Sequence, residues 1–213
     1  MRTVEKLDVK APIVYRRKRV AAYCRVSIES ERMQHSLSAQ ISYYNDLIQK
    51  NPERLVLFPY TQENLSLFNR DLPAFESYYR VKYRGEELDY LLTGFLKKLE
   101  LEIAEDPSHY LFFTEFLIVC RENDTIIGSI DFKYVPRDGL TEVGYGLNPH
   151  FEGRGYMTEA LTAFLQFGKT LGICTVRADT LRDNLKSQRV LHKCGFRFLC
   201  EDETIWWEKE LDP

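Results

Sequence analysis

The apolar residues between positions 54 and 213 alternate between the spacing of strands and that of helices. Two apolar runs, 113–120 and 125–132, flank the turn-forming residues 122–124 and predict a β-hairpin. In chain order, the pattern predicts a strand over 54–59, helices through roughly 62–105, strands over 113–120, 125–132 and 142–147, a helix over 155–170, a strand over 173–180, a helix over 184–194 and two final strands. This order of strands and helices is typical of an α/β fold.

A glycine-containing segment joins the predicted strand over 142–147 to the helix over 155–170. Residues 150–161 read HFEGRGYMTEAL, with Gly153 and Gly155 directly before the helix. Two glycines let the backbone pass close to a ligand, and the following helix directs free N–H groups and its positive dipole end to the same point. The segment therefore predicts an anion site, although tight strand-to-helix turns also carry two glycines for steric reasons.

A second segment, 182–196, supports the reading of the first. It reads RDNLKSQRVLHKCGF. Together the two segments resemble the GNAT superfamily of acetyl-coenzyme A-dependent N-acetyltransferases, and its Rim-like branch in particular. The opening strand over 54–61 and the alternating strand over 173–180 are also similar to those of the family. The resemblance covers about residues 53–213, which we treat as an acetyltransferase domain.

The resemblance implies a GNAT fold, with a mixed, mostly antiparallel central sheet flanked by helices. It also implies acetyl transfer from acetyl-CoA, without a metal, to a primary amine that attacks the thioester directly. The acceptor would be a small-molecule amine or a peptide N-terminus, and the resemblance leaves a homodimer open. By their places in the family's motifs, the predicted coenzyme-binding residues are Gly146, Leu147, Glu152, Gly153, Arg154, Gly155, Tyr156 and Asn184.

Four residues are candidates for the chemistry that this reaction requires. The attacking amine must be neutral, and the departing thiolate needs a proton or a dipole. Glu142 is the predicted base, acting directly or through a water, although an ion pair with a neighbouring cation is an alternative role for it. Glu159 is the competing base, and its alternative role is to complement the helix dipole. Ser187 is predicted to stabilise the thiolate, and Asn184 to hydrogen-bond the pantetheine arm or the leaving group.

Two residues depart from the family's pattern. His150 stands where the family usually has Gln or Arg, and Leu191 stands where many members have a Tyr that protonates the thiolate. These departures leave a second function open, namely a CoA-binding but catalytically idle protein that acts in regulation or interaction. Cys194 lies near the expected thioester, but a structural thiol is the simpler interpretation.

Residues 1–52 form an extension of different character. A basic run over 16–19 precedes a strand pattern that ends in YCRVS (23–27), and a helical pattern follows over 36–48. This segment resembles the start of the catalytic domain of serine recombinases of the resolvase/invertase family.

The recombinase resemblance implies Ser27 as a nucleophile, Arg25 as a phosphate-binding partner and Gln40 in the lining of the site. Phosphodiester attack needs several converging arginines, because charge stabilisation carries most of the effect. In that family they lie further along the domain, whereas this chain changes to the acetyltransferase strand after residue 52. We therefore expect an inactive strand-helix extension, with DNA strand transfer as the least favoured function and DNA an unlikely partner.

Composition agrees with a soluble globular protein. The chain has 213 residues, of which 44% are hydrophobic and 29% charged, and a formal net charge of -3 that offers no attraction to nucleic acid or an anionic membrane. It has neither a membrane-spanning stretch nor the apolar core of a secretion signal, so we expect a cytoplasmic protein. Its five cysteines, without Cys-x-x-Cys spacing, argue against a disulfide framework or a zinc site, and most are expected to be buried thiols.

Overall fold

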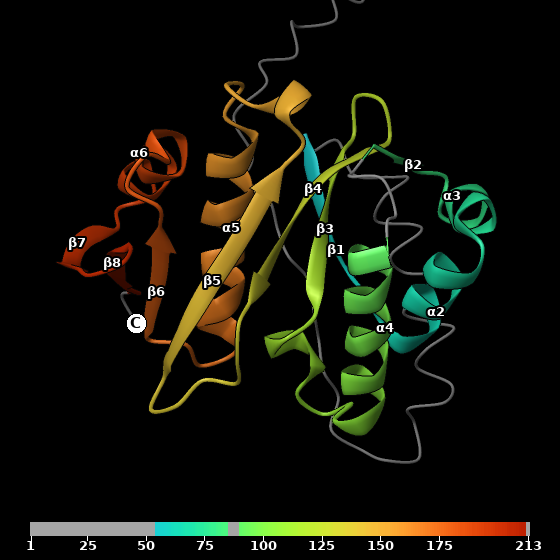
Figure 1. Ribbon diagram of the computed structural model, residues 1–213, viewed down its shortest axis with the longest axis horizontal. Helices are drawn as coiled ribbons and strands as arrows, with labels where there is room; N and C mark the ends of the chain where they lie inside the picture. The colour runs from blue at the N-terminus through green and yellow to red at the C-terminus, as the bar shows by residue number, and fades with distance from the viewer. Residues whose placement is uncertain (1–53, 85–89, 212–213) are drawn as a thin grey trace, which may run out of the picture.

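The computed structural model describes residues 54–84 and 90–211, which form one sheet with helices on both faces (Figure 1). The sheet has eight strands in the order β1-β3-β4-β5-β6-β8-β7, and β2 pairs with β4 beside this path. Only the β5–β6 and β2–β4 pairs are parallel. The predicted α/β fold, with a mixed and mostly antiparallel sheet flanked by helices, is confirmed.

The predicted elements are present with small changes at their ends. The strands are β1 (Leu55–Pro59), β2 (Lys82–Tyr83), β3 (Glu115–Cys120), β4 (Thr125–Phe132), β5 (Leu140–Leu147), β6 (Thr175–Thr180), β7 (Arg197–Glu201) and β8 (Ile205–Glu210). The helices are α2 (Gln62–Arg70), α3 (Leu72–Tyr79), α4 (Tyr90–Glu105), α5 (Tyr156–Thr170) and α6 (Leu185–Lys193), with short 3-10 turns η1 (Tyr110–Phe112) and η2 (Pro149–Phe151).

The helices begin where side chains can satisfy their first amides. Thr61 and Asn64 form a capping box at the start of α2, and Asp71 accepts from the amide of Ala74 at the start of α3. Asn184 caps α6 in the same way, through a bond from the amide of Ser187. The start of α5 differs, because its N-cap residue is Gly155, which has no side chain.

Two apolar cores lie on opposite faces of the sheet. On one face α5 packs through residues such as Phe164 and Leu161 against β3 and β4, where Phe132 stacks on Phe164 with ring centroids 4.2 Å apart. On the other face α2, α3 and α4 cover β1, β3 and the start of β4. Because strand side chains alternate between faces, neighbouring residues of β1 such as Leu57 and Phe58 belong to different cores.

The sheet opens in the middle. β5 pairs with β6 only through its first three residues, Leu140 to Glu142, but with β4 through its last five, Val143 to Leu147. Beyond Glu142 the two parallel strands diverge, as Figure 1 shows for the arrows of β5 and β6. The backbone edge of residues 143–147 on the side of β6 therefore forms no strand pair with β6, although β4 pairs with the other edge.

Two features differ from the sequence predictions. The region predicted as helical over roughly 62–105 contains the strand β2, which is too short to leave a periodic pattern. Cys174 and Cys200 are exposed, so the expectation that most cysteines are buried is wrong for them. Cys174 lies just before β6 and Cys200 lies on the edge strand β7, where no second layer covers the side chain.

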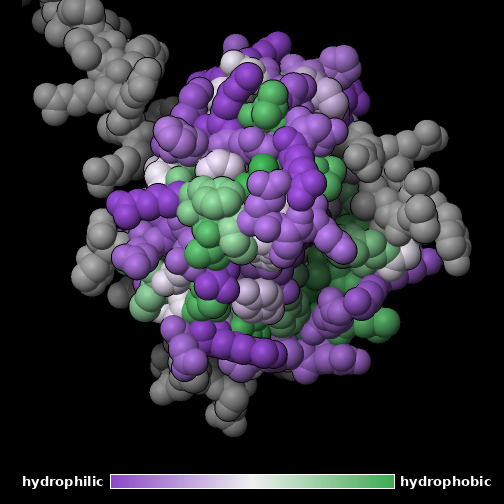
Figure 2. Space-filling model, turned by 60° about the vertical axis from the view of Figure 1, so that its left-hand side comes forward, coloured by the Kyte–Doolittle hydropathy of each residue, from purple (hydrophilic) through white to green (hydrophobic). Residues whose placement is uncertain are grey.

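The recombinase-like residues Arg25, Ser27 and Gln40 lie outside the described residues. Within the described ranges, no helix is both long and apolar enough to cross a membrane. The face turned forward in Figure 2 is largely hydrophilic, with apolar side chains gathered in smaller areas between polar ones.

Candidate functional site

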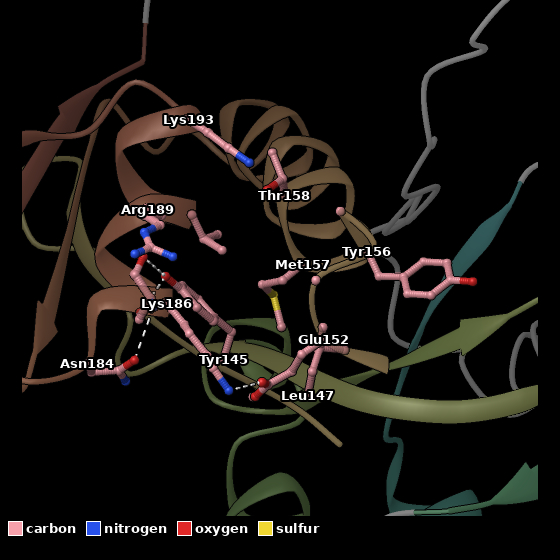
Figure 3. A pocket seen from close by; sticks show the side chains of 15 residues that line it. Tyr145, Leu147, Glu152, Tyr156, Met157, Thr158, Asn184, Lys186, Arg189 and Lys193 are labelled. Atoms are coloured by element: carbon pink, nitrogen blue, oxygen red, sulfur yellow. Dashed lines mark hydrogen bonds and ion pairs between the residues drawn. The ribbon is translucent and has the colours of Figure 1, made fainter. Parts of the chain in front are cut away.

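A cleft of about 680 Å³ lies between the end of β5, the glycine loop that follows it, the start of α5, and α6 (Figure 3). Three separate segments of the chain meet at this place, and each was singled out in the sequence. The lining residues are Tyr145, Gly146, Leu147, Glu152, Gly153, Gly155, Tyr156, Met157, Thr158, Asn184, Lys186, Ser187, Arg189, Val190 and Lys193.

The glycine loop adopts a backbone that only glycine adopts readily. Gly153 and Gly155 have φ angles of 74° and 82°, in the left-handed region. A Cβ atom on either residue would meet no atom of the described chain within 4 Å, so the space beside both is open. Among the described residues no side chain caps α5, and helix geometry leaves its first amides without an intrahelical acceptor. These amides and the positive end of the dipole provide an anion-binding position.

Arg54 directly precedes β1, and its side chain contacts the glycine loop. Its Nη2 donates to the carbonyl of Arg154 at 3.0 Å, and its Nη1 lies 3.6 Å from the carboxylate of Glu159. The guanidinium also lies 4.0 Å from the centroid of the Tyr156 ring, which points away from the cleft (Figure 3). This contact spans 100 residues of sequence, and no local pattern indicated it.

Five of the predicted coenzyme residues can now be described more specifically. Tyr156 borders the cleft while its ring is buried against Arg54, so only its backbone suits the predicted role. Arg154 does not line the cleft, and its guanidinium lies 5.9 Å from the ring of Phe151. Glu152 lines the cleft and forms an ion pair with Lys186 on α6. Gly146 and Leu147 lie where β5 has left β6.

The start of α6 brings the two predicted polar residues of the second segment together. The Oδ1 atom of Asn184 accepts from the amide of Ser187 at 3.1 Å, which leaves the Nδ2 group of Asn184 as the donor for a ligand. The hydroxyl of Ser187 lies 2.8 Å from that of Tyr145 on β5. Leu191, which stands where the resemblance implies a Tyr, is fully buried in the core under α6.

The cleft wall on α6 is cationic, which the sequence reading missed. Lys186, Arg189 and Lys193 all line the cleft, and their spacing of three and four residues places them on one face of the helix. That spacing is visible in the sequence, whereas the formal net charge of -3 describes only the chain as a whole. The three cations and the amides of α5 together make the cleft suited to a polyanionic ligand.

Glu142 does not line this cleft. Side chains alternate along β5, so Glu142 lies on the sheet face opposite to Tyr145, near Asp131 of β4 and Lys133, which directly follows β4. Burial is the main cause that raises the pKa of Glu142, and the charges of Asp179 and Asp131 raise it further while Lys133 lowers it. Arg177, the register partner of Glu142 on β6, binds Glu208 instead, with Nε 2.8 Å from the carboxylate. The alternative role of Glu142, an ion pair with a neighbouring cation, stays a prediction, and Lys133 is the nearby cation that acts on its pKa.

The other candidates occupy structural positions. Glu159 contacts Arg54 on the far side of the glycine loop, and exposed His150 is outside the cleft lining. Cys194 is half-buried beside Thr158 and Thr162, and burial raises the pKa of its thiol, which opposes a reactive thiolate. Within the described residues, no group of three or more His, Cys, Asp and Glu side chains could hold a metal ion.

Comparison with known proteins shows the family to which the chain belongs. Residues 54–197 match the family model described as "Acetyltransferase (GNAT) domain". The chain is 32% identical over 84 residues to the uncharacterized N-acetyltransferase YnaD of Bacillus subtilis, a match that covers 39% of this chain and about half (49%) of YnaD.

Solved structures share the fold. The ribosomal-protein-S5-alanine acetyltransferase of Vibrio fischeri superposes with a TM-score of 0.56 and 18% identity, over 75% of this chain and 94% of that one. The microcin C7 self-immunity acetyltransferase MccE, solved with acetyl-CoA and AMP, has a TM-score of 0.52 and 16% identity, over 76% and 94% of the two chains. On the match to residues 54–197, the chain belongs to the GNAT acetyltransferase family.

Proposed function

We propose that the protein transfers an acetyl group from acetyl-CoA to a primary amine. The observation that carries this proposal is the cleft in which the open amides of α5 face three cations of α6 beside the unpaired edge of β5. Helix amides and cations suit phosphate groups, and a free strand edge suits the amide groups of a pantetheine arm. These are the two chemical parts of coenzyme A that lie between its nucleoside and its sulfur.

The residues fit this co-substrate in a consistent order. The amides of residues 153–157 would hold the diphosphate, with Lys186 and Arg189 opposite them. The backbone of Gly146 and Leu147 would bind the pantetheine arm, and Asn184 would donate to it through Nδ2. Acetyl-CoA supplies the activated thioester carbon that the amine attacks.

Glu142 is the proposed base. It lies on the other face of β5, so an amine could approach through the opening between β5 and β6 while the thioester lies in the cleft. The amine nitrogen forms a bond to the carbonyl carbon, and Glu142 takes the amine proton directly or through a water. The carbon–sulfur bond then breaks, and Ser187 donates a hydrogen bond to the sulfur that receives the electron pair. A raised pKa suits Glu142 to this role, because it increases the basicity of the carboxylate.

The acceptor is proposed to be either a small-molecule amine or a protein N-terminus. The name of the Vibrio fischeri neighbour describes a ribosomal-protein acetyltransferase, whereas MccE is named for self-immunity to microcin C7. Both share the fold of this chain at low identity, so both acceptor classes belong in the same screen.

Two measurements test the proposed function. Calorimetric titration with acetyl-CoA should detect binding, and a panel of small primary amines and short peptides with free N-termini should give acceptor-dependent release of free thiol. Binding of acetyl-CoA without transfer to any acceptor would favour the catalytically idle alternative. Absence of binding would contradict both.

A further inference from the structure

The contact between Tyr145 and Ser187 joins the two walls of the cleft. The Tyr145 hydroxyl comes from β5 and lies 2.8 Å from the Ser187 hydroxyl on α6, and also 3.4 Å from the Ser187 carbonyl. Both residues line the cleft, and Figure 3 shows Tyr145 reaching from β5 toward α6. A tyrosine and a serine hydroxyl thus meet inside the cleft, whereas Leu191, which stands where the resemblance implies a Tyr, is buried in the core and does not line the cleft.

In a serine near the start of a helix, a backbone carbonyl of the preceding turn can compete with a ligand for the hydroxyl hydrogen. The serine hydroxyl readily donates to a backbone carbonyl three or four residues earlier, which turns its hydrogen away from solvent and from any ligand. For Ser187 these carbonyls belong to Asn184 and Asp183. Within the described part of the chain, the Ser187 hydroxyl instead bonds to Tyr145.

Tyr145 is suited to be the donor of this pair. Burial raises the pKa of Tyr145 to about 12, with the hydrogen bond to Ser187 acting against the shift, so the phenol keeps its proton at neutral and moderately alkaline pH. If the phenol donates to Ser187 Oγ, the serine hydrogen is free to point elsewhere. A hydroxyl has one hydrogen and two acceptor lone pairs, so accepting from Tyr145 leaves Ser187 able to donate to a second partner.

We propose that Tyr145 is a positioning residue that fixes the Ser187 hydroxyl as a donor toward the sulfur of coenzyme A. The inference rests on the proposed function, since it requires the thioester to lie in this cleft. No proton leaves Tyr145 in this scheme. The sulfur receives the electron pair of the broken carbon–sulfur bond, the Ser187 hydrogen bond stabilises that charge, and the thiolate later takes a proton from solvent.

The ionisation of CoA bound to the protein tests the proposal without an acceptor amine. A hydrogen bond to the thiolate lowers the pKa of the bound thiol, which can be followed by the ultraviolet absorbance of the thiolate. Ser187→Ala should raise the pKa of the bound thiol by about 1 relative to the unaltered protein. Tyr145→Phe should raise it by a similar amount, and the double variant by no more than either single variant, because the two hydroxyls act as a unit.

Controls and kinetics separate this role from a structural one. Tyr78→Phe removes a phenolic hydroxyl from an exposed residue on α3 and should leave the pKa of the bound thiol unchanged. With any acceptor found, Tyr145→Phe should lower kcat roughly tenfold and leave the dissociation constant of CoA unchanged, which is the pattern of a group acting in the transition state. Additive effects in the double variant, or an unchanged thiol pKa in Tyr145→Phe with CoA still bound, would overturn the inference. Failure of the unaltered protein to bind CoA would instead overturn the proposed function.

Discussion

Two carboxyl groups show how burial changes residue chemistry on this sheet. Glu142 and Glu115 both lie on strands, and burial is the first cause of a raised pKa in each. Glu115 lies opposite Asp131 in the β3–β4 register, and its pKa is raised to about 7 by burial and then by the charge of Asp131, with Lys133 and Ser129 acting against the shift. Only Glu142 lies on the strand that also borders the cleft.

Glu142→Gln is expected to lower kcat about 100-fold and to leave the dissociation constant of acetyl-CoA unchanged. In the unaltered enzyme kcat/KM should rise with pH through the raised pKa of Glu142 and then level, because only the ionised carboxylate accepts the amine proton. The matched variant Glu159→Gln should keep this pH profile and most of the rate, since Glu159 contacts Arg54 instead. If Glu159→Gln is the variant that loses activity, the two roles are exchanged.

Glu115 makes a prediction about stability. Its pKa in the folded state is about 7, above the ordinary glutamate value of 4.5, so the folded state holds more protons between these two pH values. Stability should therefore fall as pH rises through this window, and the loss should be complete above pH ~7. Glu115→Gln keeps the neutral form and should raise the free energy of unfolding at pH ~8 by on the order of 2 kcal/mol, with little change at pH ~4. Denaturant unfolding at the two pH values measures this, and equal effects at both would contradict it.

At the scale of elements, the strand β5 and the helix α5 build the site through the loop that joins them. β5 supplies an unpaired edge because it leaves β6 after Glu142, and α5 supplies open amides because its N-cap is a glycine. Arg54 holds this loop by donating to the carbonyl of Arg154. The shape of the loop therefore depends partly on Arg54, which directly precedes β1 and lies far from the loop in the sequence.

Gly153→Val should abolish detectable binding of acetyl-CoA, with a loss of more than about tenfold in affinity. The variant has a side chain where the backbone must approach the diphosphate, and it opposes the left-handed φ of 74°. Gly172→Val is the matched control, because Gly172 has a φ of 83° and open space beside it but lies at the other end of α5. Both variants should lose similar stability in thermal unfolding, whereas only Gly153→Val should lose coenzyme binding in calorimetry.

At the scale of the whole molecule, charge is distributed unevenly. The chain has a formal net charge of -3, yet Lys186, Arg189 and Lys193 gather along one wall of the cleft. Glu152 lines the same cleft and pairs with Lys186, so the described lining has three cations and one acid. Such a local excess of one sign of charge attracts ligands of the opposite sign even when the whole protein does not.

Lys193→Gln should weaken acetyl-CoA binding by roughly threefold at low salt and should reduce the dependence of affinity on ionic strength. The physical reason is the loss of one of three cations that face the polyanionic ligand. Lys98→Gln, an exposed residue paired with Glu102 on α4, should change neither quantity. Equal salt dependence in the unaltered protein and in Lys193→Gln would show that this lysine does not face the ligand.

The N-terminal extension gives a further prediction for the complete chain. Ser27→Ala should leave the rate of acetyl transfer unchanged, because the described residues that line the cleft all lie within 145–193. A steady-state rate measurement on the full chain tests this. A rate that falls with Ser27→Ala would mean that residues 1–52 contribute to the site.

The sequence by itself determined the fold class, the order of the elements apart from β2, and the three segments that form the cleft. Periodicity and turn residues act over a few positions, so they can be read locally, as at the two apolar runs that flank residues 122–124 and at the glycine pair. Eight of the ten residues predicted from motifs line one cleft, and the exceptions are Arg154 and Glu142. Motif position located these two on the chain but not the direction of their side chains.

Only the tertiary structure decided which distant groups meet. The hydrogen bond from Arg54 to the glycine loop and the Tyr145–Ser187 pair each connect residues that are far apart in the chain. The point at which β5 separates from β6 also depends on two segments that are distant in the sequence. The face on which Glu142 lies depends on the register of β5 against its neighbours, and a shift of one residue would have reversed it. Such contacts arise from the packing of whole elements, and packing leaves no signal within a single segment of sequence.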